Sequence, residues 1–425
     1  MVLHTVTKGE TLYSIANYYG VNEQRLRINN GIDEDARLAV GQCVAVMFEQ
    51  LLHTVSPGET LYSIAEKYSV TPMQLLRNNL FLGGRDLVFP GDELVIEYER
   101  APLGSYEIGG YAYPFIDESL LYQALPFMTY LMPFTYGFNP EDGTLVPLDD
   151  ERLLTAAAGY QTKGYMHLST LGEDGNFSSQ AAATLLSDRA LWQTLAENIL
   201  ANMEARSYYG LDIDFEFIGG AYAAAYAEFV TFMREFMNAR GKPVIVALAP
   251  KTYAEQPGDL YKGHDYKALG EAANGVLLMT YEWGYTYGPP LPVSPLPSVR
   301  RVVEYALTEI ESGKIFLGIS NYGYNFTLPY VQGVSKAPSL STKEAVDLAV
   351  RTGSEILYDE QAQAPYFFYT EDGVSHQVYY EDARSISARL MLLEEYSLRG
   401  ALYWNLMRRN EQNLLMLNYY IDIVK

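Results

Sequence analysis

Three carboxylates fall at alternate positions, Asp212, Asp214 and Glu216, with apolar residues between and after them. In an extended chain, residues i, i+2 and i+4 point to one face about 7 Å apart, so we expect one acidic row. Like charges this close raise one another's pKa, and a carboxylic acid kept protonated in this way can act as a general acid. A metal site or an exposed strand face are the simpler interpretations. The apolar residues of 213–218 favour a buried strand instead, and no His or Cys lies near enough in the sequence to complete a transition-metal site.

The amino-acid composition limits the kinds of ligand that the chain is expected to bind. The chain has 425 residues and a formal charge of −22. Nucleic acids and anionic membranes are bound through basic surfaces, so neither is expected and a neutral ligand is favoured. The 37 tyrosines and three tryptophans supply flat faces that suit stacking on sugar rings. With only five histidines, no metal centre or cofactor is expected, and His167 is interpreted as a barrel histidine with satisfied hydrogen bonds.

Targeting signals are not recognisable. Residues 1–6 do not begin a charged and then apolar secretion signal, and no run reaches the roughly 18 apolar residues that a membrane span needs. We therefore expect no membrane insertion. Cys43 is the single cysteine, which rules out an internal disulfide, and it is interpreted as a small buried hydrophobe.

The first 98 residues contain an internal repeat. Gly9-Glu10-Thr11-Leu12-Tyr13-Ser14-Ile15-Ala16 recurs without change at 58–65, an offset of 49 residues. Each unit, 1–49 and 50–98, is predicted to form a short strand, two helices and a closing strand. The sequence therefore predicts two βααβ modules.

The repeated pattern Gly-Glu-Thr-Leu-x-x-Ile-Ala, followed by Leu-x-x-Asn-Asn, resembles the LysM module. The resemblance implies binding of N-acetylglucosamine-containing glycans, such as peptidoglycan or chitin, between the first strand–helix loop and the loop after the second helix. The contacts it implies are Gly9, Glu10, Thr11, Leu12, Asn30, Gly31 and Ile32 in the first module, and Gly58, Glu59, Thr60, Leu61, Asn79, Leu80 and Phe81 in the second. For Leu12, Ile15 and Ala16 the spacing of a buried helix face makes a structural role the better interpretation.

From residue 107 to 425, after a short connection at 99–106, apolar runs alternate with helical patterns. Eight such units predict an α/β fold, a (β/α)8 TIM barrel, with catalytic residues at the carboxyl ends of its strands. Glu216 ends the fourth run, as expected of a catalytic residue. The segment Glu355–Tyr380 contains a turn at Asp372-Gly373 and predicts a small β-hairpin insertion near the barrel mouth. The eight runs are Glu107–Phe115, Thr129–Tyr136, Lys163–Ser169, Gly210–Glu216, Val244–Pro250, Gly275–Trp283, Ile315–Tyr322 and Gly400–Asn405.

The acidic row on the fourth strand resembles glycoside hydrolase family 18, whose usual motif is Asp-x-x-Asp-x-Asp-x-Glu. The order and spacing of pieces at later strand ends, Met279–Trp283, Gly318–Gly323 and Trp404, support the resemblance over all of 107–425. It implies a retaining glycosidase in which the substrate's own 2-acetamido oxygen attacks the anomeric carbon.

The family's mechanism assigns a role to each matching residue. Glu216 would protonate the leaving oxygen and then deprotonate water, Asp214 would bind the acetamide nitrogen, and Asp212 would share a proton with Asp214. Tyr281 would bind the acetamide from the other side, and Trp404 would lie under the reacting sugar. The further substrate-binding residues that the resemblance implies are Met279, Glu282, Trp283 and Asn321.

Two positions depart from the family pattern. Tyr209 stands where the motif usually has its first Asp, furthest from the chemistry, so activity is still expected. Glu282 stands where Asp usually follows the sixth-strand tyrosine. It would contact the neighbouring sugar or form a rim salt bridge, and the two interpretations are equally favoured.

The paired modules, the missing secretion signal and the run Met279–Pro290 are similar to the spore-associated branch of the family, which includes cortical-fragment-lytic N-acetylglucosaminidases. This implies an N-acetylglucosaminidase that acts on spore-cortex peptidoglycan or its fragments, in the coat or cortex region of an endospore-forming bacterium. The alternatives are a chitinase and a non-catalytic glycan-binding protein. The presence of Glu216 argues against the second.

Overall fold

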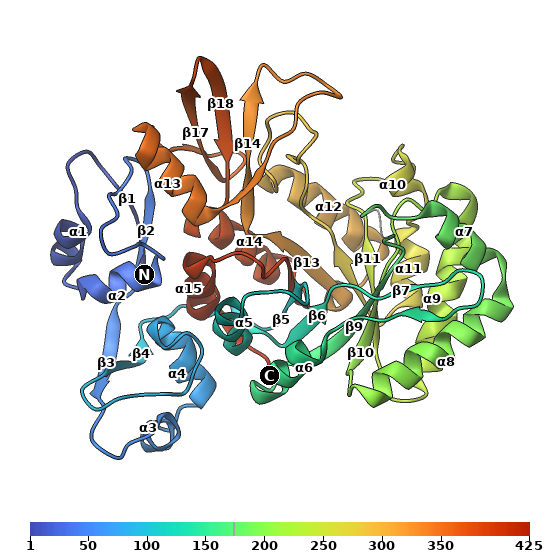
Figure 1. Ribbon diagram of the computed structural model, residues 1–425, viewed down its shortest axis with the longest axis horizontal. Coiled ribbons are helices and arrows are strands. Elements are labelled where there is room, and N and C mark those ends of the chain that lie inside the picture. Colours follow the sequence, from blue (N-terminus) through green and yellow to red (C-terminus); the bar gives the residue numbers. More distant parts are fainter. Residues whose placement is uncertain (173–174) are drawn as a thin grey trace.

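The computed structural model, which describes residues 1–172 and 175–425, consists of two small modules, a barrel, and a sheet inserted into the barrel (Figure 1). In Figure 1 the modules lie at the left, the inserted sheet at the top, and most of the barrel's helices at the right. In the described ranges, no helix is long and apolar enough to cross a membrane.

Each N-terminal module is a βααβ unit, as the repeat predicts. In each, the first helix begins after a threonine, Thr11 or Thr60, whose hydroxyl accepts a hydrogen bond from the third helical amide in a capping box. The two strands of each module pair antiparallel. The elements are β1 (Val2–Thr5), α1 (Leu12–Tyr19), α2 (Glu23–Asn29) and β2 (Cys43–Val46), then β3 (Glu49–Thr54), α3 (Leu61–Tyr68), α4 (Pro72–Asn78), the short η1 (Leu80–Leu82) and β4 (Glu93–Tyr98).

Eight parallel strands close into a barrel, which confirms the predicted fold class. The last barrel strand, β19, pairs with the first, β5, and so closes the ring. Strands β10 to β13 are buried along their whole length, as is usual for parallel strands covered on both faces. They are β5 (Gly104–Ala112), β6 (Tyr130–Pro133), β9 (Lys163–Ser169), β10 (Gly210–Asp214), β11 (Val244–Leu248), β12 (Gly275–Leu278), β13 (Ile315–Ser320) and β19 (Gly400–Trp404); β20 (Ile421–Ile423) adds beside the start of β5.

Helices surround the barrel and bury their apolar faces on the outside of its strands. The α9 helix places Tyr226 and Phe229 on Phe215, with ring centroids 5.7 and 5.8 Å apart. This packing fixes the outward face of the segment that carries the acidic row. The helices are α5 (Glu118–Ala124), α6 (Glu151–Gly159), α7 (Ser179–Ser187), α8 (Arg189–Ala205), α9 (Ala223–Asn238), α10 (Asp259–Lys262), α11 (Tyr266–Ala272), α12 (Leu296–Glu309), α14 (Ala383–Glu395) and α15 (Glu411–Tyr420); β7 (Gly137–Phe138) and β8 (Leu145–Val146) form a small hairpin.

The insertion between β13 and β19 is larger than the predicted hairpin. That hairpin is present as β17 (Ala364–Glu371) and β18 (Val374–Tyr379), but it is the middle of a five-stranded antiparallel sheet covered by a helix. A two-stranded ribbon cannot cover its own apolar face, and Phe367 and Val378 pack here with Ala345 and Ala349 of that helix. The remaining elements are β14 (Tyr322–Leu328), β15 (Ser339–Ser341), α13 (Thr342–Thr352) and β16 (Leu357–Asp359).

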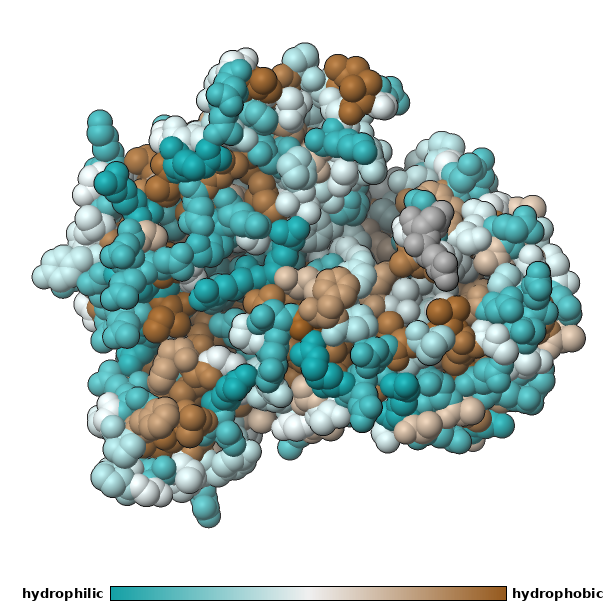
Figure 2. Space-filling model, in the orientation of Figure 1, coloured by the Kyte–Doolittle hydropathy of each residue, from teal (hydrophilic) through white to brown (hydrophobic). Residues whose placement is uncertain are grey.

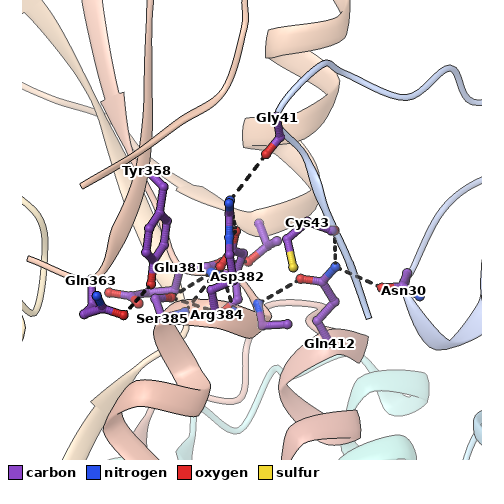
Figure 3. Close-up of polar contacts among 12 residues, drawn as sticks. Asn30, Gly41, Cys43, Tyr358, Gln363, Glu381, Asp382, Arg384, Ser385 and Gln412 are labelled. Carbon is purple, nitrogen blue, oxygen red and sulfur yellow. Dashed lines mark hydrogen bonds and ion pairs between the residues drawn. The ribbon is translucent and has the colours of Figure 1, made fainter. Parts of the chain in front are cut away.

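Both modules pack against α15, the last barrel helix. The Gln412 side-chain amide donates hydrogen bonds to Asn30 Oδ1 (3.0 Å) and to the Cys43 carbonyl (2.8 Å) of the first module (Figure 3). Six residues later on the same helix, Asn418 donates a 2.9 Å hydrogen bond to Asn78 Oδ1 of the second module. The modules therefore lie directly on the barrel.

Candidate active site

The acidic row lies at the carboxyl end of β10. Asp212 and Asp214 are in the strand and buried, whereas Glu216 is half-buried and follows two residues after the strand ends. The intervening Ile213 and Phe215 are 0% exposed and pack in the outer core, so the two faces alternate as predicted. Directly after Glu216 the chain turns away through Phe217, whose φ of 54° is unusual for a residue with a side chain.

Asp212 lies at the bottom of the row, inside the barrel. Its Oδ2 accepts a 2.7 Å hydrogen bond from the Tyr111 hydroxyl on β5. Burial raises the pKa of Asp212 to about 6, an effect that the charge of His167 and the Tyr111 hydrogen bond oppose and the charge of Asp214 reinforces. Asp212 can therefore gain or lose a proton near neutral pH.

His167 lies beside both aspartates. It is on β9, in register with Asp212, and its Nε2 lies 3.5 Å from Asp214 Oδ2 and 3.9 Å from Asp212 Oδ2. Its Nδ1 is hydrogen-bonded with Thr135 Oγ1 at 2.6 Å. Nε2 forms no hydrogen bond with any residue that the structure describes, so the expectation of a fully satisfied histidine is wrong.

Glu216 is held in its acid form. Burial, and then the charges of Asp214 and Glu282, raise the pKa of Glu216 to about 8. The row's spacing predicted a raised pKa through like charges, but burial is the larger cause. At neutral pH Glu216 carries a proton that it can donate.

Aromatic residues surround the row. Tyr281 and Trp404 are partly buried, and each contacts both the barrel's inner core and the apolar cluster of the insertion. Phe134 packs edge-on against Trp404, with ring centroids 4.8 Å apart. Burial holds the pKa of Tyr281 well above its usual range, so its hydroxyl remains a hydrogen-bond donor. Met279 is 9% exposed in the same inner core.

Glu282 lies at the rim, on the side of the insertion. Its carboxylate accepts hydrogen bonds from the hydroxyls of Tyr322 and Tyr324 on β14. Its backbone φ is 65°, a conformation that costs a side-chain-bearing residue of order 1–3 kcal/mol. Within the described part of the chain Glu282 forms no ion pair, and the rim salt bridge considered from the sequence is absent there.

Two other predicted substrate residues lie in different environments. Asn321, directly after β13, is 3% exposed, and its Oδ1 has no hydrogen-bond partner among the described residues. Trp283 is partly buried against the outer core, and its amide bonds the Val293 carbonyl at 3.0 Å. The structure thus groups Met279, Tyr281 and Trp404 but places the Trp283 side chain in another cluster.

Tyr209, the variant position of the motif, lies at the opposite end of β10 from Glu216. Its ring stacks on Tyr130, with centroids 6.0 Å apart and planes at 18°, and Lys163 Nζ lies 4.9 Å from the ring centroid. Tyr209 therefore packs at the amino-terminal mouth of the barrel, remote from the acidic row.

The predicted LysM contact residues divide into exposed and buried groups. Gly9, Thr11, Gly58, Thr60 and Phe81 are exposed, and Glu10, Gly31, Ile32 and Glu59 are half-buried. Leu12, Leu61 and Leu80 are buried in apolar cores.

Asn30 and Asn79, one in each module, stabilise the module fold through hydrogen bonds to the backbone. Asn79 donates to the Leu75 and Val95 carbonyls and accepts from the Val95 amide at 2.8 Å. Asn30 does the same in the first module with Leu26 and Ala45. The neighbouring Gly31 faces Glu411 of α15, so this loop of the first module packs on the barrel.

Sequence reasoning missed several residues of the site. Tyr111 and His167 lie inside predicted strands, but their contacts with the aspartates were not expected. Tyr322 ends the seventh predicted run, and Tyr324 lies beyond it in a strand that was not predicted. A signal did exist for His167, because in parallel strands the inward residue of one strand lies beside the inward residue of the next. That signal could be used only with knowledge of which residue of β9 lies beside which residue of β10, and the sequence alone does not give this register.

The surface beside the site is hollowed. The insertion leaves the barrel at the carboxyl end of β13, the end of the barrel that carries Glu216. Figure 2 shows a hollow between the insertion, at the top, and the barrel helices at the right.

Comparison with known proteins identifies the family. The profile of the glycosyl hydrolases family 18 matches residues 123–408, and the LysM domain profile matches 4–46 and 53–97. A cortical fragment-lytic enzyme of Bacillus subtilis is 40% identical over 306 residues, 71% of this chain and 70% of that one, and one of Bacillus anthracis is 35% identical over 98% of both. The crystal structure of the Bacillus megaterium spore cortex-lytic enzyme SleL is 33% identical and superposes with a TM-score of 0.83 over 100% of this chain and 98% of that one. The chain belongs to glycosyl hydrolase family 18, and it is a glycosidase with two N-terminal LysM modules.

Proposed function

We propose that this glycosidase cleaves N-acetylglucosaminyl bonds in peptidoglycan, in spore cortex or its fragments, by substrate-assisted retaining catalysis. The observation that carries the proposal is the position of the half-buried Glu216 two residues beyond the buried Asp212 and Asp214, with Tyr281 packed against the inner cluster of the barrel. This arrangement provides one general acid and a site for an acetamido group. The acetamido oxygen, not a second carboxylate, is the nucleophile in this proposal.

In the first step the glycosidic C–O bond breaks. The carbonyl oxygen of the substrate's 2-acetamido group attacks the anomeric carbon, and Glu216 transfers its proton to the departing oxygen. Asp214 accepts a hydrogen bond from the acetamido N–H and stabilises the positive charge that develops on the resulting oxazolinium ring. Tyr281 donates to the same acetamido group.

In the second step water opens the oxazolinium ring. Glu216, now ionised, removes a proton from the water molecule while the water oxygen bonds to the anomeric carbon. The acetamido group leaves that carbon and the original configuration is restored. Trp404, with Phe134 packed on its edge, forms an apolar surface under the reacting sugar.

The relatives support peptidoglycan as the substrate. The names of the Bacillus anthracis relative and of the SleL structure, which both match over nearly the whole chain, refer to cortical fragments and to spore cortex. A cortex substrate places the protein in the coat or cortex region of a spore, or otherwise at the cell wall. The LysM modules would hold the same glycan through their exposed positions, of which Thr11, Thr60 and Phe81 have side chains.

Parallel digestion of purified spore cortex and chitin tests this proposal, with the new reducing ends identified by mass spectrometry. Reducing N-acetylglucosamine from cortex supports it. Chitobiose from chitin without cortex products identifies a chitinase and contradicts it. Binding to either glycan without cleavage identifies a glycan-binding protein.

A further inference from the structure

A buried imidazole lies at the centre of the site and has no part in the mechanism above. His167 is 1% exposed. On β10 it faces Asp212 and Asp214, and on β5 it faces Tyr111, whose ring lies edge-on with its centroid 5.3 Å away. After β6 it faces the Phe134 ring at 4.7 Å and the Thr135 hydroxyl. The two aspartates and Tyr111 are therefore the titratable groups around it.

Thr135 offers an acceptor for one nitrogen of the ring. Its hydroxyl can donate to the Tyr136 carbonyl (3.2 Å) or to Ser169 Oγ (3.0 Å). When it does so, Thr135 Oγ1 is left as an acceptor, and Nδ1 of His167 is the donor in the 2.6 Å contact between them. The Nδ1 position then carries a hydrogen.

The other nitrogen, Nε2, points at the carboxylates. In a neutral ring with a hydrogen on Nδ1, Nε2 presents a lone pair. That lone pair would face Asp214 Oδ2 at 3.5 Å and Asp212 Oδ2 at 3.9 Å in a largely buried site, and all three groups would be acceptors. One proton must therefore lie between Nε2 and the aspartate pair.

We propose that His167 is a positioning residue that carries this proton, so that both oxygens of Asp214 remain acceptors for the substrate's acetamido N–H. With the proton on Nε2 the cluster contains one imidazolium and two carboxylates. With the proton on an aspartate it contains one carboxylate and two neutral groups. The net charge is the same, and only the first arrangement leaves Asp214 free of the proton. This inference rests on the proposed function, since it assigns the cluster a task in that reaction.

The electrostatics of Asp212 agree with this placement. Among the influences on the pKa of Asp212, the positive charge of His167 is the largest that opposes burial. Without that charge Asp212 would hold its proton to higher pH. An opposite charge within about 4–6 Å typically lowers a carboxyl pKa by about 1–3 units.

The first test is the pH dependence of kcat/KM in His167→Gln, with soluble cortical fragments as substrate. Glutamine keeps a hydrogen-bond donor but cannot carry the charge. We expect the acidic limb to move to higher pH by about one unit, with the alkaline limb unchanged. A uniform fall in rate with both limbs in place would mean a merely structural role and would overturn the proposal. His376→Gln, in the insertion sheet, is the matched control and should leave both limbs unchanged.

A second variant leaves the imidazole in place. Thr135→Val removes the acceptor of Nδ1, so the ring loses the contact that directs Nε2 at the aspartates. We expect a smaller shift of the acidic limb in the same direction, and no shift would contradict the argument.

A measurement that needs no activity separates this inference from the proposed function. In protein labelled with ¹⁵N-histidine, one-bond ¹⁵N–¹H couplings should show a hydrogen on both ring nitrogens of His167. Asp214→Asn should leave a hydrogen on only one of them. A His167 without a hydrogen on Nε2 in the parent protein would overturn the inference even in an active enzyme. A hydrogen on both nitrogens in an enzyme that cleaves neither cortex nor chitin would refute the proposed function alone.

Discussion

Tyr111 on the first barrel strand donates a 2.7 Å hydrogen bond to Asp212 on the fourth, across the inside of the barrel. The bond stabilises the ionised form of Asp212 against the effect of burial. Tyr111→Phe should therefore raise the pKa of Asp212 above about 6, and lower kcat/KM at pH 7 by about tenfold, the usual effect of losing a hydrogen bond to a charged group. Tyr113→Phe keeps its ring contact with Trp404 and should be neutral; equal losses in both variants would contradict the assignment.

Glu216→Gln should abolish hydrolysis and leave glycan binding intact. Glutamine has nearly the same shape but no acidic proton, and a positioned general acid and base contributes about 10²–10⁴-fold. Reducing-end release measures the loss, and retention on insoluble cortex measures binding. Glu204→Gln, on the exposed side of α8, is the charge-matched control. An active Glu216→Gln enzyme would remove Glu216 from the mechanism.

The same substitution should change the pH dependence of stability. The pKa of Glu216 is about 8 in the folded protein, against 4.5 for a free glutamate side chain, so the folded state binds more protons between these values. The stability that this group contributes is complete below pH 4.5 and is lost as the pH rises through 8. Glu216→Gln should therefore raise the melting temperature relative to the parent by several degrees at about pH 9 and by little at about pH 4. A pH-independent difference would argue against the raised pKa.

Glu282→Gln should move the alkaline limb of the rate profile. The Glu282 charge helps to raise the pKa of Glu216, after burial and Asp214. Its removal should lower that pKa, so activity should begin to fall below about pH 8 instead of near it. The kcat/KM profile measures this limb. If the limb stays in place while KM rises, Glu282 acts in sugar binding alone.

Two equivalent glycines test how the first module is attached. Gly41 and Gly91 donate to the corresponding valine carbonyls of the two modules and have φ values of 83° and 97°. A Cβ on Gly41 would lie 1.8 Å from the Ile356 carbonyl oxygen of the insertion, whereas one on Gly91 would meet nothing within 4 Å. Gly41→Ala should therefore destabilise the protein by about 1–3 kcal/mol more than Gly91→Ala, the usual cost of overpacking.

Thermal unfolding measures the difference between the two alanine variants, and protease release of residues 1–98 reports whether the module has detached. Backbone strain is common to both variants, so it cancels in the comparison. Equal behaviour would mean that the contact with Ile356 contributes nothing to docking.

The period-two pattern around Phe215 and the eightfold alternation of apolar runs were sufficient to predict the barrel and the position of the acidic row. Both patterns can be read from neighbouring residues in the sequence, and the barrel is the fold that buries the apolar residues of both. The insertion was underestimated because β14 follows β13 after Asn321 alone, so two strands of different sheets appear in the sequence as one apolar run.

The other gaps concern contacts between distant segments. The contact of His167 with the aspartates depends on strand register, and the Tyr111 bond depends on closure of the barrel. The contacts of Asn30 and Asn78 with α15 join residues more than 300 positions apart. No local pattern contains this information.

The packing of both modules on α15 also limits which bonds of a bound glycan the active site can reach. Modules on a flexible tether would let the active site sample many bonds around one anchoring point. Here the distance between the LysM modules and the active site is fixed. A glycan strand bound by the modules would therefore present a single glycosidic bond to the active site, at a set length from the point where the modules hold it. Fragments shorter than that length would gain no effective concentration from the modules, and longer strands would gain it in full.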